Sequence, residues 1–256
     1  NGIRVRQRVK ELGLSESVGR CVRSMEAAEN LLRLSGRSGQ ALRLAANDEL
    51  GTLRFLAGTN LAAREGTFTG TPREAAGRFL ADNRALLRLE DPAAELRHIK
   101  TVTSRDGMSA IRYQQTHGGL DVWGHDLVVR VDGSGSVLGL SGHYRPTPRL
   151  DSLEPAIPAG QAAAAAHEHL AARDAVSGHG LREDPELILY PTAGELRLAW
   201  RMVFAAGLSY RTEAFVDAGS GELLHSLDLI YRDGPATGSG QDLSGQSRTL
   251  DLYQVG

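Results

Sequence analysis

The stretch at residues 109–144 constrains the fold more than any other part of this chain, because its pattern predicts an antiparallel meander. Apolar residues at positions 111 and 113 alternate with polar neighbours, as in a half-buried strand. Val128, Val129 and Val131 are β-branched and favour another strand. Glycines within residues 132–135 supply the positive φ angles of a tight turn. Such a meander must bury one of its faces.

The same design returns at residues 196–229, which indicates an internal duplication. Residues 216–221 repeat the valine, aspartate and small turn residues of 131–135. Each meander follows a predicted helix. The first helix starts with a capping box at Thr71 and Glu74 and ends near residues 82–83, and the second is the alanine-rich segment 161–172. The pattern therefore predicts two α+β modules, each a helix packed on an antiparallel sheet.

Further strands complete these modules. They are predicted at residues 52–58, 95–103, 186–190, 195–205, 209–217 and 222–230. Residues 146–158 hold four prolines and are predicted to be the linker. Residues 232–247 are rich in glycine and serine and predict an exposed, flexible stretch. A strand at 249–253 would then have no partner.

The first 40 residues combine positive charge with helical periodicity. Through position 37 there are eight basic residues and four acidic ones. Apolar residues recur at helical spacing, which predicts one amphipathic helix. A membrane-surface or partner helix is one interpretation; the favoured one is a solvated helix or an extension outside the modules. No apolar run follows the basic start, so any export leader would lie upstream or have been removed. The periodic residues are Val18, Cys21, Val22, Met25, Ala28 and Leu32.

Composition excludes several classes of protein. A length of 256 residues suits roughly two domains. The net charge of −2 gives no general case for binding nucleic acid or an anionic membrane. No apolar run of about 18 residues is present, so no membrane span is expected. A single cysteine, Cys21, excludes an intrachain disulfide but leaves export open.

Candidate catalytic and metal sites are weak. His167 and His169 lie about 200° apart on a helix, and position 171 is alanine, so the zinc-peptidase spacing fails. His117, His125 and His143 accompany the first meander without a paired acidic or cysteine ligand. No serine has the context of a nucleophile elbow. The chain itself is therefore expected to be neither an enzyme nor a metal protein.

At this point the chain resembles a known family. The first module is similar to the fungalysin/thermolysin propeptide domain of secreted bacterial zinc metallopeptidases, and residues 158–229 are similar to a PepSY domain. Residues 236–243 resemble the start of the mature peptidase, whose zinc-binding helix would lie beyond residue 256. The residues that carry the resemblance are Glu74, Ala75, Ala76, Phe79, Leu80, Leu86, Leu89, Arg112, Tyr113, Gln114, Gln115, 119–124, 127–132, 236–240 and Leu243.

The resemblance implies a fold of two cystatin-like modules and the following domains. They are an N-terminal helical extension at 1–45, the propeptide-like domain at 46–145, a linker at 146–157, the PepSY-like domain at 158–232, and a cleavage junction with the start of the peptidase at 233–256. Motif and core positions of the propeptide domain are Phe79, Leu80, Arg112, Tyr113, Gln115, Val122, Gly124, Val129 and Val131.

The resemblance also implies a function. Such pro-regions assist the folding of their own peptidase and inhibit it until they are cleaved. The partner would be the cognate thermolysin-like catalytic domain, with zinc and calcium held only there, and no nucleic acid or membrane span is expected. An inhibitory tail would carry His225, Leu227, Leu229 and Tyr231, and the cleavage junction would be Asp233, Gly234, Pro235 and Ala236.

Two alternatives remain open. The chain could be a stand-alone exported binding or inhibitory module without its own peptidase, which a natural stop codon after residue 256 would favour. It could also be an enzyme that uses His117, His125 and His143, which stoichiometric zinc in the purified protein would favour.

Overall fold

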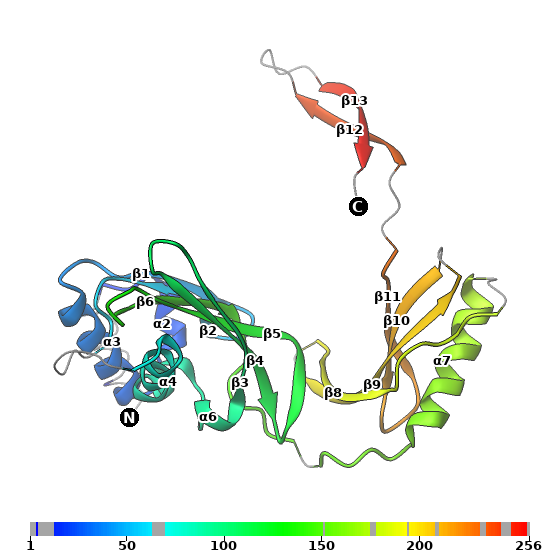
Figure 1. The fold of residues 1–256 in the computed structure, drawn as a ribbon, viewed down its shortest axis with the longest axis horizontal. Helices are drawn as coiled ribbons and strands as arrows, with labels where there is room; N and C mark the ends of the chain where they lie inside the picture. The colour runs from blue at the N-terminus through cyan, green and yellow to red at the C-terminus, as the bar shows by residue number, and fades with distance from the viewer. Residues whose placement is uncertain are drawn as a thin grey trace. The chain divides into compact units, whose positions relative to one another are not determined.

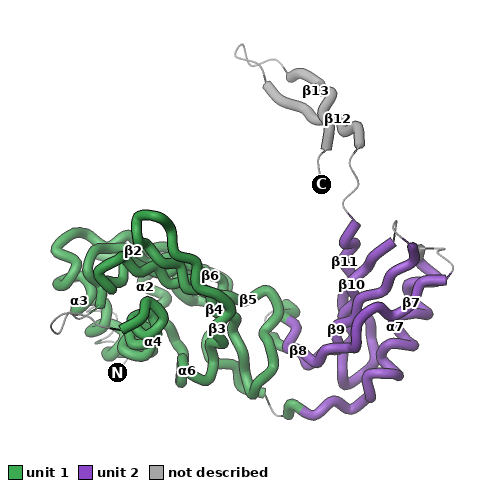
Figure 2. The backbone as a smooth tube through the Cα atoms, viewed as in Figure 1, with its two compact units in different colours: residues 1–153, 191–196 green, residues 154–190, 197–256 purple. Residues whose placement is uncertain are grey.

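The computed structural model of this chain shows an α+β fold that divides into two compact units (Figures 1 and 2). Unit 1 comprises residues 1–153 and 191–196, and unit 2 comprises residues 154–190 and 197–256. The predicted fold class is thereby confirmed. The structure describes residues 4, 13–62, 70–150, 152–174, 178–193, 195–207 and 210–230, together with the backbone of 234–241 and 247–254.

Unit 1 is built on an antiparallel sheet in which the order of the strands is β1-β2-β6-β5-β4-β3. The predicted meander forms its centre. One row of core residues, Ile111, Val129, Leu140 and Leu56, crosses four strands in register. The strands are β1 (Arg43–Asn47), β2 (Thr52–Ala57), β3 (Leu96–Thr103), β4 (Ser109–His117), β5 (Leu120–Val131) and β6 (Val137–His143).

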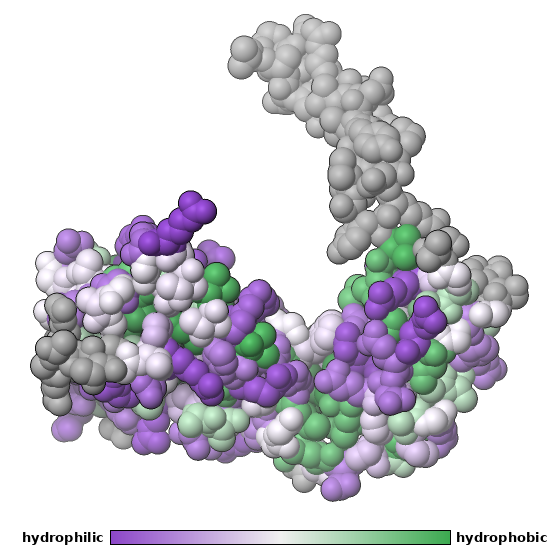
Figure 3. All heavy atoms as spheres, in the orientation of Figure 1, coloured by the Kyte–Doolittle hydropathy of each residue, from purple (hydrophilic) through white to green (hydrophobic). Residues whose placement is uncertain are grey.

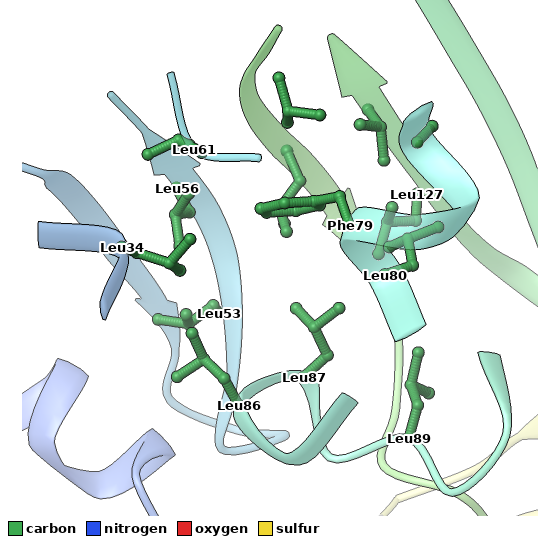
Figure 4. Close-up of a cluster of buried hydrophobic side chains, with 14 of the residues drawn as sticks. Leu34, Leu53, Leu56, Leu61, Phe79, Leu80, Leu86, Leu87, Leu89 and Leu127 are labelled. Carbon is green, nitrogen blue, oxygen red and sulfur yellow. The ribbon is translucent and has the colours of Figure 1, made fainter. Parts of the chain in front are cut away.

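Helices cover one face of this sheet (Figure 1). Helix α4 (Pro72–Asp82) starts at the predicted capping box, where Thr71 Oγ1 accepts from Glu74 N and Glu74 Oε2 accepts from Thr71 N. Phe79 and Leu80 project from α4 into a leucine-rich core shared with β2 and β5 (Figure 4). The other helices are α2 (Glu16–Cys21), α3 (Met25–Ser38), α5 (Arg84–Leu87) and α6 (Pro92–Glu95).

The N-terminal segment differs from its prediction. It forms two helices, α2 and α3, because Ser24 caps a new helix by accepting a hydrogen bond from Ala27 N at 3.0 Å. Leu31 and Leu34 of α3 are buried in the main core of unit 1. The interpretation as a solvated helix or an outlying extension is therefore wrong, since these residues help to bury the sheet.

Unit 2 repeats the plan with a single helix. Helix α7 (Ala159–Asp174) buries Ala162, Ala166 and Leu170 against residues of the sheet such as Phe204 and Val216. Alanines on this face allow the helix backbone to lie close to the strands. The strands are β7 (Gly180–Leu181), β8 (Glu186–Pro191), β9 (Leu196–Ala206), β10 (Tyr210–Asp217) and β11 (Leu223–Asp228), with β10 between β9 and β11.

The duplicated turns have the same local chemistry. Asp132 Oδ1 accepts from the backbone N–H groups of Ser134 and Ser136 at 2.8 and 2.9 Å. Asp217 Oδ1 accepts from those of Gly219 and Ser220, both at 2.8 Å. Both turns close on a glycine with positive φ, 79° at position 135 and 82° at position 221.

The C-terminal segment also differs from its prediction. Residues Gly234–Gln241 form strand β12, where a flexible stretch was predicted, and Ser247–Gln254 form strand β13. The two strands pair with each other in antiparallel fashion. Strand β13, which was expected to have no partner, thus pairs with β12.

Candidate functional site

Four consecutive residues of β4, Arg112 to Gln115, have four different structural roles. Arg112 lies on the exposed face, where its Nε donates to Asp126 Oδ2 at 2.7 Å. Tyr113 points the other way and is buried in the core of unit 1. The alternation follows from the strand period of two residues.

The side-chain amide of Gln114 supports a bulge in β5. Its Nε2 donates to the carbonyl oxygens of Val122 at 2.7 Å and His125 at 3.0 Å. Gln114 pairs with Asp126, and Thr116 pairs with Asp121. Between these two pairs, β4 has one residue, Gln115, whereas β5 has four, residues 122–125. Gly124 makes the bulge feasible because its φ is +68°.

Gln115 holds the chain where it leaves the sheet. Its fully buried amide donates from Nε2 to Arg145 O at 2.8 Å and accepts at Oε1 from Arg145 N at 2.9 Å. One side chain thereby satisfies both backbone groups of a residue beyond β6. The start of the predicted linker is fixed to β4 by this pair of hydrogen bonds.

A buried carboxylate holds the same segment two residues later. Glu95 is 5% exposed, and its Oε1 accepts from the backbone N–H groups of Glu90 and Asp91 at 2.8 and 2.7 Å. Its Oε2 accepts from Thr147 Oγ1 at 2.7 Å. This role was not predicted from the sequence, because a glutamate between a helix and a strand carries no signal of burial.

His125 and His143 lie together, with ring centroids 4.6 Å apart. Hydrogen bonds fix the His125 ring as the neutral tautomer: Nδ1 donates to Trp123 O at 2.7 Å, and Nε2 accepts from Arg145 Nε at 3.3 Å. Burial lowers the pKa of His125 to about 4; the hydrogen bond to Trp123 opposes this lowering, and His143 and Arg145 add to it. Neither ring nitrogen of His125 is left for a metal ion.

The remaining titratable candidates give no catalytic arrangement. His167 and His169 are both exposed on α7, and the His167 ring stacks on His179 at 4.4 Å. Within the described ranges, no group of three histidine, cysteine or acidic side chains could hold a metal ion. Cys21 is buried in α2, and burial raises the pKa of its thiol. Of these residues, Cys21 packs in the core of unit 1, and the His167 ring packs on His179 at the surface of α7.

Most of the motif and core positions expected for the propeptide-like domain are buried in unit 1. Phe79, Leu80, Val122, Val129 and Val131 are each at most 2% exposed. Together with Tyr113 and Gln115 they point inward, whereas Arg112 and Gly124 are exposed. Most of these positions therefore pack the core of unit 1, and the other two lie at its surface.

The segment predicted to be an inhibitory tail begins inside the sheet of unit 2. His225 and Leu227 belong to β11 and pair with Phe215 and Glu213 of β10. Leu229 N still donates to the carbonyl oxygen of Arg211 at 2.8 Å. One side of this extended strand is thus paired with β10, and the inhibitory role of the segment stays a prediction.

The rest of the predicted tail and junction cannot be placed in the same way. Tyr231 and Asp233 lie outside the described residues. Gly234, Pro235 and Ala236 are described only by their backbone, as the first residues of β12. Cleavage at this junction stays a prediction.

Comparisons with known proteins agree with the motif in unit 1. A family model described as the Fungalysin/Thermolysin Propeptide Motif matches residues 94–144. The match begins just before β3 and ends just after β6, so it covers β3 to β6 with the Gln114 and Gln115 contacts.

Other comparisons add less. A search of curated proteins found no match. Among solved structures, the chain is similar to one described as the Bacillus megaterium YpeB C-terminal domain, at 14% identity and a TM-score of 0.35. That similarity covers 85% of this chain and 99% of the other.

Proposed function

We propose that this chain is the pro-region of a secreted thermolysin-like zinc metallopeptidase, which assists the folding of the peptidase and inhibits it until cleavage. The single observation that supports this most directly is the propeptide motif at residues 94–144. That motif coincides with a continuous antiparallel sheet, a preformed surface on which a large partner could condense during folding. None of the described helices is long and apolar enough to cross a bilayer.

Under the same proposal, the catalytic groups would belong to the peptidase domain. Zinc and calcium would belong to the peptidase domain, and this chain would contribute no catalytic group. Inhibition would come from the segment that follows β11, because a covalently attached extended segment has a high effective concentration at the active-site cleft. Because His225 to Asp228 are already paired with β10, the inhibitory residues would lie after residue 230. Cleavage near residues 234–236 would remove the tether.

The test starts with the gene. The reading frame is expected to continue into a His-Glu-x-x-His zinc motif, and a stop codon directly after residue 256 would favour the stand-alone inhibitory module instead. The peptidase domain so encoded would be purified, mixed with rising amounts of this chain, and assayed on a small peptide substrate. Saturable inhibition is expected. A chain ending at Ile230, which keeps β11 and its pairing intact, should inhibit at least about tenfold more weakly.

A refolding assay tests the second part of the proposal. The denatured peptidase domain should regain more activity when the chain is present than when it is absent. If the intact chain neither inhibits the peptidase domain nor improves its refolding, the pro-region assignment is wrong.

A further inference from the structure

The face of the unit 1 sheet that lies opposite the helices has an unusual composition, and we call it the open sheet face. The register defines it: the row Ile111, Val129, Leu140 and Leu56 faces the core, so the neighbouring positions face outward. Its floor is made of small or aliphatic residues on four adjacent strands. They are Ala57, Ala110, Val128, Gly139 and Ser141.

Basic side chains lie on the open sheet face, among these small and aliphatic residues. Arg130 on β5 and Lys100 on β3 are both exposed, and Lys100 pairs in register with Arg112 on β4. On β1, Arg43 is also exposed, and its guanidinium lies 5.9 Å from the centroid of the Phe55 ring. The cations thus extend across the sheet from one edge strand to the other.

The neighbouring carboxylates do not neutralise this charge. Asp126 is 2.7 Å from Arg112, and Asp121 is within 2.5 Å of Arg97, so each carboxylate already has its own arginine. Among the described residues, Lys100 and Arg130 form no ion pair with the protein. The open sheet face therefore carries two basic side chains without an ion pair, in a chain whose net charge is −2.

The floor of the face suits close contact with a folded surface. Small residues allow a partner to approach the backbone, and half-buried Val128 and Phe55 with exposed Val102 add apolar contact area. Figure 3 shows the hydropathy of the side of unit 1 that faces the viewer, where green and pale residues lie among purple ones. A partner that adds a strand at the β3 edge is less well supported. The pairing of β3 is irregular at Ile99, and such bulges discourage edge-to-edge pairing.

We infer that the open sheet face binds an acidic surface of the peptidase domain, with Arg130 and Lys100 as its central charges. This inference rests on the proposed function and adds the location and the chemistry of the contact. Complementary charge would steer the two domains together and fix their orientation, while the aliphatic floor would supply the buried area. The positive charge selects an acidic occupant, because a basic surface would be repelled.

The test is a double charge reversal with a control of equal net charge. The variant Lys100→Glu/Arg130→Glu changes the open sheet face and leaves the Arg112–Asp126 pair intact. The control Arg37→Glu/Arg73→Glu changes the same total charge on α3 and α4, which cover the opposite face. Circular dichroism and melting temperature would establish that both variants fold. Inhibition constants for the encoded peptidase domain would then be measured at 50 and 300 mM NaCl.

The expected result is a loss of affinity of about tenfold or more at 50 mM NaCl for the open-face variant, shrinking at 300 mM, with the control close to the unaltered chain. If the unaltered chain inhibits and the open-face variant inhibits equally well, the inference is wrong and the proposed function stands. If the unaltered chain neither binds nor inhibits, both are wrong. Binding to vesicles of anionic lipid would be measured in parallel; if the double substitution weakens only that binding, the face serves a membrane surface and the inference is likewise wrong.

Discussion

Replacing His125 with asparagine should remove a large part of the pH dependence of the stability of unit 1. The ring of His125 is 2% exposed, and its pKa is lowered from 6.5 to about 4, chiefly by burial. In the unfolded chain this histidine regains its ordinary pKa. The unfolded state therefore takes up a proton at higher pH than the folded state, and folding opposes that protonation.

The sign and magnitude follow directly. The stabilising contribution is complete above pH 6.5 and is lost as the pH falls through the window between 6.5 and about 4. Each pH unit inside this window costs ~1.4 kcal/mol. Between pH 7.5 and pH 5 the wild-type chain should therefore lose about 2 kcal/mol that a chain without a titrating group at this position keeps. Asparagine suits the test because its amide nitrogen can take the place of Nδ1 and donate to Trp123 O.

Urea unfolding at pH 7.5 and pH 5, followed by the fluorescence of Trp123, measures the effect. Both chains would carry Trp200→Phe, so that the signal reports unit 1 alone. The quantity of interest is the difference between the two pH values, because the constant cost of the substitution cancels in it. Equal pH dependence in both chains would refute the reasoning, and would mean that the folded structure accommodates the imidazolium.

Two further changes test the contacts around the β5 bulge by the same unfolding assay, and a third, in α4, serves as the control for the glycine substitution. Gln115→Leu leaves the backbone N–H and C=O of Arg145 without their partners and should destabilise unit 1 by about 2 kcal/mol; a cost near zero would show that the amide does not hold the chain there. Gly124→Ala forces a side chain onto a φ of +68° and should cost about 1 kcal/mol. Gly77→Ala in α4, where nothing lies within 4 Å of the added methyl group, should instead stabilise by up to about 1 kcal/mol, and the same sign for both substitutions would contradict the assigned backbone roles.

Much of the fold could be predicted because its signals are local. The capping box at Thr71 specifies where α4 begins, and β-branched residues specify β5. The N-terminal segment was misjudged because an amphipathic stripe has the same pattern whether it covers a core, a partner or a membrane. Strand β12 was missed because a run of glycine and serine carries no alternation, and its pairing with β13 depends on residues that follow it.

The candidate site was less predictable, because its chemistry depends on contacts between distant residues. Gln115 and Arg145 are 30 residues apart, and nothing in either sequence neighbourhood indicates that an amide will pair with that backbone. The burial of His125 depends on the bulge beside it, which no local pattern encodes. The basic character of the open sheet face becomes evident only from the register, which brings Lys100, Arg112 and Arg130 onto one side of three strands.

The turns that contain Asp132 and Asp217 fix the pairing register of the strands that they join. Asp132 fixes the turn between β5 and β6 through hydrogen bonds to backbone N–H groups, and Asp217 does the same between β10 and β11. Burial acts to raise the pKa of Asp217, but the N–H groups of the turn more than offset this and lower it, so the carboxylate stays ionised and remains an acceptor. Because side chains alternate across a strand, a slip of one residue at the first turn would turn Val131 outward and Arg130 into the core. A short turn sequence thereby decides which side of the sheet is apolar, and with it which side carries the charges available to a partner.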